Sequence, residues 1–177
     1  MRGLVIFRSY YKIAHARYNE CMYKVSAHSR QEYISEATRA GRDIEALDMF
    51  IRESAPDLQP WFYDVGPHDP GMTFKMLGYG MFTYKPKKSA ADMIQWPVIG
   101  VAIQKNYISI YISITRDDKP LLDFYRTDLG CTRSGNNNFS FETFGQLDKD
   151  ALKKLLQEVE TIFKHDATNP VRFKESR

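Results

Sequence analysis

The sequence predicts an α+β fold, and two kinds of periodicity support this assignment. Residues 96–115 alternate apolar and polar side chains on both sides of a two-residue turn, which is typical of an antiparallel β-hairpin. Residues 29–54 and 148–164 instead repeat apolar side chains every three or four positions, which is typical of amphipathic helices. We therefore expect strands that pair directly with each other, with helices before and after them.

The hairpin has two faces of different character. A turn at Lys105-Asn106 places Ile99, Val101 and Ile103 opposite three further isoleucines and completes one apolar face: Ile112, Ile110 and Ile108. The other face consists of small, polar and aromatic residues: Gly100, Ala102, Gln104, Tyr107, Ser109, Tyr111 and Ser113. This face is too polar for a core and too aromatic for an ordinary solvated surface.

Two tyrosines on this second face, Tyr107 and Tyr111, project over small residues and could receive a flat ligand or the side chain of a partner. The alternative is that one of the chain's own helices covers the face. The candidate ligand-binding residues are Tyr79, Lys105, Tyr107, Ser109 and Tyr111.

The segments before the hairpin predict helices and then a strand. Residues 29–37 and 42–54 form two helical stretches broken near Ala40-Gly41, with Ile44, Leu47 and Ile51 facing inward and four acids outside: Asp43, Glu45, Asp48 and Glu53. Pro56 ends the second helix. Residues 74–84 predict one or two strands with a bulge or close approach at Gly78-Tyr79-Gly80.

The segments after the hairpin predict a short helix at 120–129 that ends at Gly130, a loop at 132–138 and a last strand at 139–144. Asp148 is the expected cap of the final helix. We divide the chain into an N-terminal helical appendage (1–28), one domain (29–164) and a mobile tail (165–177).

Composition limits the class of protein. Hydrophobic residues are 43% of the 177 residues and charged residues are 27%, as in an ordinary globular domain. The short apolar runs and the lone cysteines Cys21 and Cys131 favour a cytoplasmic protein without disulfides, signal peptide or membrane partner. The net charge of +3 does not by itself indicate nucleic acid, but the basic segment 1–28 is a candidate for such a contact, for a homodimer or for a protein partner.

Several acids around the first two helices suggest a metal site. Glu45 and Asp48 lie three residues apart on one helix face, and Glu32 and Glu36 precede them. Carboxylates without cysteine suit a hard, weakly held cation such as ferrous iron. The alternative is an ordinary solvated helix face.

Five segments occur in an order that resembles the YdhG-like family of small bacterial proteins: 51–56, 77–82, 98–111, 129–130 and 147–152. The resemblance covers residues 30–160 and implies an antiparallel sheet with N- and C-terminal helices packed on it, frataxin-like in outline. An iron-carrier role has been proposed for the family, and no catalytic motif comes with it. This chain differs from the family pattern by residues 1–28 and by a longer loop at 85–95.

These observations favour a non-enzymatic binding protein, with weak iron binding on the acids as its most concrete form. The alternatives are a small-molecule-binding protein or enzyme that uses the Tyr107/Tyr111 face, and a nucleic-acid contact through the basic N-terminal segment.

Overall fold

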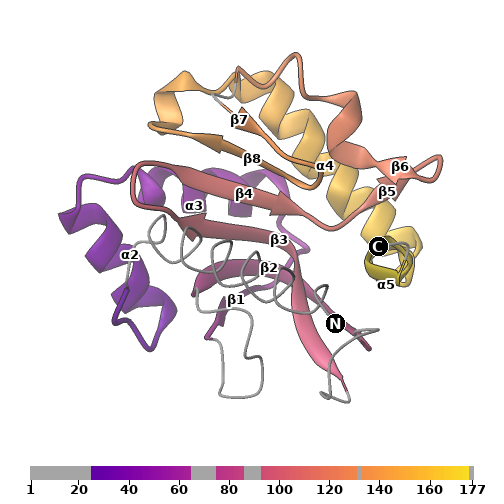
Figure 1. Cartoon of the computed structure of the whole chain (residues 1–177), viewed down its shortest axis with the longest axis horizontal. Coiled ribbons are helices and arrows are strands. Elements are labelled where there is room, and N and C mark those ends of the chain that lie inside the picture. Colours follow the sequence, from indigo (N-terminus) through magenta and orange to yellow (C-terminus); the bar gives the residue numbers. More distant parts are fainter. Residues whose placement is uncertain (1–24, 65–74, 86–92, 131–132, 176–177) are drawn as a thin grey trace, which may run out of the picture.

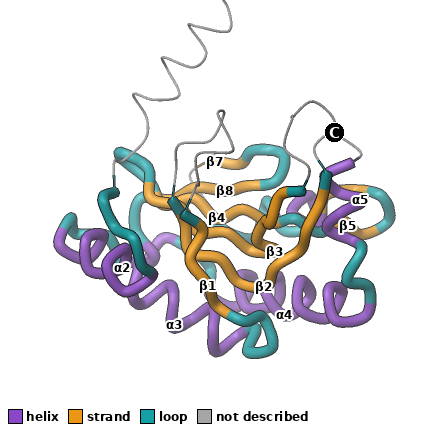
Figure 2. The backbone as a smooth tube through the Cα atoms, turned by 90° about the horizontal axis from the view of Figure 1, so that it is seen from below, coloured by secondary structure: helices purple, strands orange, loops and turns teal. Residues whose placement is uncertain are grey.

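The computed structural model describes residues 25–64, 75–85, 93–130 and 133–175, and these form an α+β domain. Six antiparallel strands make one sheet in the order β1-β2-β3-β4-β8-β7, and β5 and β6 form a separate two-stranded sheet. Helices α2, α3 and α4 lie on the same side of the large sheet (Figures 1 and 2). The predicted fold class is therefore confirmed.

The helices of the described parts are α2 (Arg30–Arg39), α3 (Ile44–Ser54), α4 (Lys149–His165) and α5 (Asn169–Glu175), with 3₁₀ helices η1 (Leu121–Phe124) and η2 (Phe144–Gln146). The strands are β1 (Pro60–Tyr63), β2 (Met76–Tyr84), β3 (Ile94–Ile103), β4 (Ile108–Ile112), β5 (Thr115–Arg116), β6 (Lys119–Pro120), β7 (Arg133–Ser134) and β8 (Asn138–Phe141). None of these helices is both long and apolar enough to cross a lipid bilayer.

The β3–β4 hairpin has the register predicted from the alternation. The Gln104 amide donates a hydrogen bond of 2.7 Å to the Tyr107 carbonyl, which closes the turn at Lys105-Asn106. Ile99, Val101 and Ile103 pair with Ile112, Ile110 and Ile108, and all six side chains are buried. The pleat then places the intervening residues, among them Ser109 and Tyr111, on the opposite face of the sheet.

Helices α3 and α4 supply apolar side chains to the core beneath the sheet: Ile44, Leu47 and Ile51, and Leu152, Leu155, Leu156 and Val159. Helix α4 starts as predicted, because the Asp148 side chain accepts a hydrogen bond of 2.8 Å from the Ala151 amide. Tyr33 of α2 is fully buried and contacts the end of β3. Its hydroxyl accepts a hydrogen bond of 2.8 Å from the backbone amide of Ile103. This bond replaces a strand partner, since β2 pairs with β3 only as far as Val101.

Two glycines have positive φ at positions where the sequence predicts a helix break or an irregular strand. Gly41 has φ of 72° between α2 and α3, and Gly80 has φ of 63° inside β2, both in the left-handed region that glycine tolerates. The Gly80 amide donates to the Gln59 carbonyl at 3.0 Å. The register of β2 against β3 is the same on both sides of Gly80, so no extra residue is inserted and the predicted bulge at 78–80 is absent. A close approach is found instead: the Trp61 ring lies so near Gly78 that a Cβ there would be 2.6 Å from the indole nitrogen.

Two predictions for the segment after the hairpin are corrected by the structure. Residues 120–129 do not form a helix throughout; only η1 is helical, because Pro120 belongs to a tight hairpin whose turn residues Asp117 and Asp118 both have positive φ. The predicted loop at 132–138 contains β7, which pairs with β8 and adds an edge strand to the sheet.

The expected tail at 165–177 is also corrected, because it contains helix α5. The Phe173 side chain is buried, and Asn169 pairs with the backbone of Thr115 by accepting from its amide at 2.8 Å and donating to its carbonyl at 2.9 Å. Lys174 lies over the Trp96 ring, with its nitrogen 4.0 Å from the ring centroid. These contacts attach α5 to the domain although its sequence is too short to show helical periodicity.

Several predictions fall outside the described residues. They concern the basic helical appendage up to residue 24, residues 86–92 of the longer loop at 85–95, and Cys21 and Cys131. The described end of the appendage is attached to α2, because the Ser26 hydroxyl donates a hydrogen bond of 2.7 Å to Glu36. Residues 25–28 therefore belong with the domain, and the predicted boundary at residue 29 is too late.

The two faces of the hairpin predict opposite effects of neighbouring substitutions. Ile110→Asp should cost at least about 3 kcal/mol, because it buries an unpaired carboxylate among apolar side chains. Tyr111→Ser should cost less than about 1 kcal/mol, because Tyr111 lies on the other face. Urea denaturation of both variants measures the difference, and equal losses would show that the assigned register is wrong.

The attachment of α5 predicts that Phe173→Ala lowers the free energy of unfolding by about 3 kcal/mol, as expected for a large side chain removed from a core. Arg172→Ala in the same helix is the matched control, because its ion pair with Asp166 is exposed and should contribute little to stability. A thermal melt in which the two variants behave alike would contradict the packing of this helix.

Candidate functional site

The polar face of the hairpin carries a pocket, which we call the Tyr107 pocket. Its volume is about 330 Å³. Three parts of the chain line it: the β3–β4 turn with β4, the β7 end, and β8. The lining residues are Gln104, Lys105, Asn106, Tyr107, Ser109, Tyr111, Arg133, Ser134, Gly135, Asn138 and Ser140.

Strand register explains why these side chains meet. Ser109 pairs with Ser140, which pairs with Arg133, so the three form one row across β4, β8 and β7. Tyr111 pairs with Asn138 in the next row. Residues that pair across antiparallel strands share a face, and every second residue along each strand shares it too. The pocket is therefore a direct consequence of the sheet geometry.

Two contacts define the shape of the pocket. The Arg133 guanidinium lies over the Tyr107 ring, with its carbon 4.4 Å from the ring centroid, as in a cation–π pair. The Ser109 and Ser140 hydroxyls are 2.8 Å apart and both residues are buried, so they form a hydrogen-bonded pair in the sheet surface. The result is a surface that combines an aromatic ring, a cation and two hydroxyl groups.

The charge of the pocket is positive. Among the described residues that line it, Lys105 and Arg133 are the charged ones and none is an aspartate or glutamate. Within the parts of the chain that the structure describes, neither cation has an ion-pair partner. A third cation, Arg42, donates a hydrogen bond to the backbone carbonyl of Lys105 in the β3–β4 turn.

The β7–β8 turn is held in place by Arg126. Two guanidinium nitrogens of Arg126 donate hydrogen bonds of 2.6 and 2.8 Å to one carboxylate oxygen of Asp123. The guanidinium also donates to the Ser134 hydroxyl and to the Gly135 carbonyl. It also donates to the Asn136 carbonyl at 3.3 Å. These bonds fix the edge of the sheet that presents Arg133 to Tyr107.

Four of the five predicted ligand-binding residues come together in this pocket: Lys105, Tyr107, Ser109 and Tyr111. Gly100, however, leaves no empty space beside Tyr111, because a Cβ there would be only 2.7 Å from the Met76 sulfur. The residues that the sequence did not indicate are Arg133, Asn138 and Ser140. Sequence alternation could not connect them to the hairpin, because β8 pairs with β4 through a long-range contact and Arg133 reaches the pocket only through the pairing of β7 with β8.

The structure separates Tyr79, the fifth predicted residue, from the pocket. Tyr79 pairs with Ile99 and therefore points to the helix side of the sheet, where its hydroxyl donates a hydrogen bond of 2.6 Å to Asp48. Burial, followed by the nearby Asp48 carboxylate, raises the pKa of the Tyr79 phenol well above its ordinary value. Tyr79 is thus a protonated donor inside the core.

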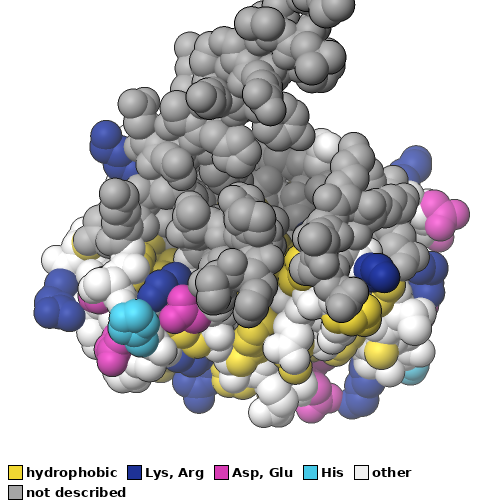
Figure 3. Space-filling model, turned by 60° about the horizontal axis from the view of Figure 1, so that its bottom comes forward, with side chains coloured by type: hydrophobic (Ala, Val, Ile, Leu, Met, Phe, Trp, Pro, Cys, Tyr) yellow, Lys and Arg dark blue, Asp and Glu magenta, His cyan; other side chains and the backbone are white. Residues whose placement is uncertain are grey.

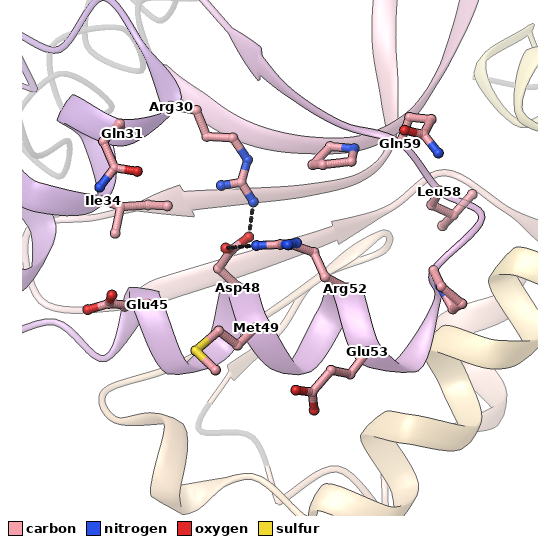
Figure 4. A pocket seen from close by; sticks show the side chains of 12 residues that line it. Arg30, Gln31, Ile34, Glu45, Asp48, Met49, Arg52, Glu53, Leu58 and Gln59 are labelled. Carbon is pink, nitrogen blue, oxygen red and sulfur yellow. Dashed lines mark hydrogen bonds and ion pairs between the residues drawn. The ribbon is translucent and has the colours of Figure 1, made fainter.

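The structure also corrects the prediction that Asp48 lies on the solvated face of α3. Asp48 is only 4% exposed. It forms an ion pair with Arg30 of α2, and the Arg52 nitrogen lies 3.7 Å from its other oxygen. Figure 4 shows Asp48 between these two arginines, while Glu45 points away from it. Asp48 is buried because Arg30 and Tyr79 satisfy its charge.

The four acids predicted to hold a metal are not brought together. Glu36 accepts from Ser26 at 2.7 Å and Glu32 accepts from the His28 amide at 2.8 Å, while Asp48 is paired with Arg30. Among the described residues, no three histidine, cysteine or acidic side chains could share a metal ion. On the face drawn in Figure 3, acidic side chains are spread out and several lie beside basic ones. The carboxylate site predicted from the sequence therefore lacks geometric support.

A second pocket, of about 720 Å³, lies between α2, α3 and the start of β1, and Asp48 lies within it (Figure 4). Its inner charged groups, Asp48, Arg30 and Arg52, are already paired with one another. Further out, Glu45 and Glu53 stand beside uncharged residues that include Met49, Leu58 and Gln59. Because the Asp48 carboxylate and the arginines are held in these ion pairs, this pocket offers a ligand fewer charged groups without an ion-pair partner than the Tyr107 pocket does.

Comparison with known proteins adds no relative: no family model, no curated protein and no solved structure matches this chain. The resemblance to the YdhG-like family, like the cytoplasmic location, stays a prediction.

The ion pair of Asp48 predicts a large difference between two acids of α3. Asp48→Ala should cost about 3–5 kcal/mol, because it leaves the charge of Arg30 uncompensated in a partly buried position. Glu45→Ala, three residues earlier and exposed, should change stability by about 0.5 kcal/mol or less. Both values can be measured by urea denaturation, and a small loss for Asp48→Ala would contradict its structural role.

Proposed function

We propose that this protein is a non-enzymatic binding protein that holds a small organic ligand in the Tyr107 pocket. The observation that carries the proposal is the convergence of Tyr107, Arg133 and the Ser109–Ser140 hydroxyl pair on one concave surface. Pockets for small molecules in proteins have volumes of about 300–1,000 Å³ and combine aromatic walls with a few placed polar groups. The volume of about 330 Å³ is at the lower end of this range.

Binding is favoured over catalysis by the kinds of side chain that line the pocket. The usual general bases are histidine and carboxylates, and the usual activated nucleophiles are cysteine, or serine beside a base. None of the lining residues is a histidine, cysteine, aspartate or glutamate, and the two serines that meet there contact each other. The pocket offers rings, hydroxyls and cations, which are recognition groups.

The Tyr107 pocket is also favoured over the acids as the working site. Glu32, Glu36 and Asp48 already accept hydrogen bonds or ion pairs from other parts of the domain, so binding a cation would disrupt these contacts. The cations of the Tyr107 pocket have no such partner in the described parts of the chain. Weak iron binding remains a prediction from the resemblance.

This proposal predicts that a small molecule accompanies the protein through native purification. Denaturing the purified protein and analysing the supernatant by mass spectrometry should recover it from the unaltered protein and at least tenfold less from Tyr107→Ala, which removes one wall of the pocket. Phe124→Ala is the matched control, because it removes a partly exposed ring outside the pocket.

Recovery of equal amounts from Tyr107→Ala and from the unaltered protein would contradict binding in this pocket. A titration provides the second check, with the recovered compound or, if nothing is recovered, with an aromatic fragment library. The proposed function would be rejected if no compound showed saturable binding that depends on Tyr107.

A further inference from the structure

We infer that the ligand of the Tyr107 pocket is an organic anion that carries a phosphate or carboxylate group beside a planar ring. This inference rests on the proposed function and adds the chemical class of the ligand. It is drawn from the charge, the hydrogen-bond donors and the ring surfaces of the pocket.

Positive charge in and near the pocket favours an anionic ligand. Lys105 and Arg133 add two positive charges to a pocket lined by no acidic residue, and the described residues provide no counter-ion for either of them. Arg42, bound to the Lys105 carbonyl, adds a third positive charge close to the same turn. An anion is attracted by all three, whereas a cationic ligand would be repelled.

The donors favour a carboxylate or phosphate group. Arginine presents its N–H groups in a planar fork that matches two oxygen atoms of such an anion. The Tyr107 ring holds the Arg133 guanidinium in one plane, which reduces the loss of side-chain entropy on binding. Among the described residues, the contact found for the Arg133 guanidinium is with the Tyr107 ring, so its N–H donors are available to a ligand.

The hydroxyl pair adds a further donor. Ser109 and Ser140 have two hydroxyl hydrogens between them, and their mutual bond of 2.8 Å uses one. The second hydrogen can be donated to a ligand oxygen that enters the pocket. Beside this pair, Tyr111 and Tyr107 give the pocket aromatic surface, against which a planar ring can pack.

The size of the pocket fits a small molecule. A volume of about 330 Å³ accommodates one ring system with its charged group. The charged group should lie between Lys105 and Arg133, with the ring toward Tyr111.

The test compares three probes that differ mainly in charge: phenyl phosphate, benzoate and the neutral benzyl alcohol. Isothermal titration calorimetry of the full chain should show saturable binding of at least one anion and at least tenfold weaker binding of benzyl alcohol. The stronger of the two anions identifies the charged group as phosphate or carboxylate. Binding should also weaken between 50 and 300 mM NaCl.

Substitutions then locate the binding. Lys105→Gln combined with Arg133→Gln should weaken binding of the anion about tenfold or more, since each removes a charge-assisted hydrogen bond. Both residues are exposed, so the melting temperature should not change. Lys153→Gln combined with Lys154→Gln on the exposed α4 surface is the matched control, because it also removes two positive charges, and it should leave binding unaltered.

The outcomes separate this inference from the proposed function. Equal binding of benzyl alcohol and the anions, lost in Tyr107→Ala, would overturn the inference of an anion and leave a binding pocket in place. Anion binding that Lys105→Gln with Arg133→Gln does not weaken would place the anion elsewhere and also overturn the inference. Failure of all three probes to bind at 10 mM would reject this ligand class, and the recovery experiment would still decide whether the pocket binds another ligand.

Discussion

The register of the β3–β4 hairpin is the constraint on which the rest of this structure depends. Because side chains alternate between the faces of a strand, a slip of one residue would move every isoleucine of the hairpin to the opposite face of the sheet and turn Tyr107 and Ser109 toward the helices. The turn at Lys105-Asn106 and the six isoleucine and valine side chains beneath the sheet both oppose that slip. The same register that builds the core therefore also fixes the polar face.

The polar face becomes a pocket only when β8 and β7 extend the sheet. Strand β8 places Asn138 and Ser140 beside β4, and β7 adds Arg133 at the edge. Arg126 holds the turn between β7 and β8 through bonds to its side-chain and carbonyl oxygens. Residue pairs that are 26 to 31 positions apart in the chain, such as Tyr107 with Arg133 and Ser109 with Ser140, thus form one surface. Stability of the core and geometry of the site come from the same pairing.

Sequence patterns predicted the local parts of this arrangement and missed the parts that depend on distant contacts. Alternation predicted the hairpin, its turn and four of the pocket residues, because strand periodicity is local. It missed Arg133, because a strand of two residues has no period, and α5, because a seven-residue helix is too short to show one. Asp48 was assigned to the solvated face because an amphipathic pattern treats carboxylates as exposed; its burial depends on Arg30 and Tyr79, which lie on other elements.

Amide chemical shifts test whether a ligand binds in the Tyr107 pocket, because they report which residues of the chain a ligand affects. Phenyl phosphate is titrated into uniformly ¹⁵N-labelled protein, and backbone shifts are followed along the chain. Binding in the Tyr107 pocket should give saturable shifts concentrated in residues 104–111 and 133–140, with α3 unaffected. Shifts concentrated instead around Arg30, Asp48 and Arg52, or no saturable shifts near Tyr107 with any small ligand that binds the protein, would contradict it.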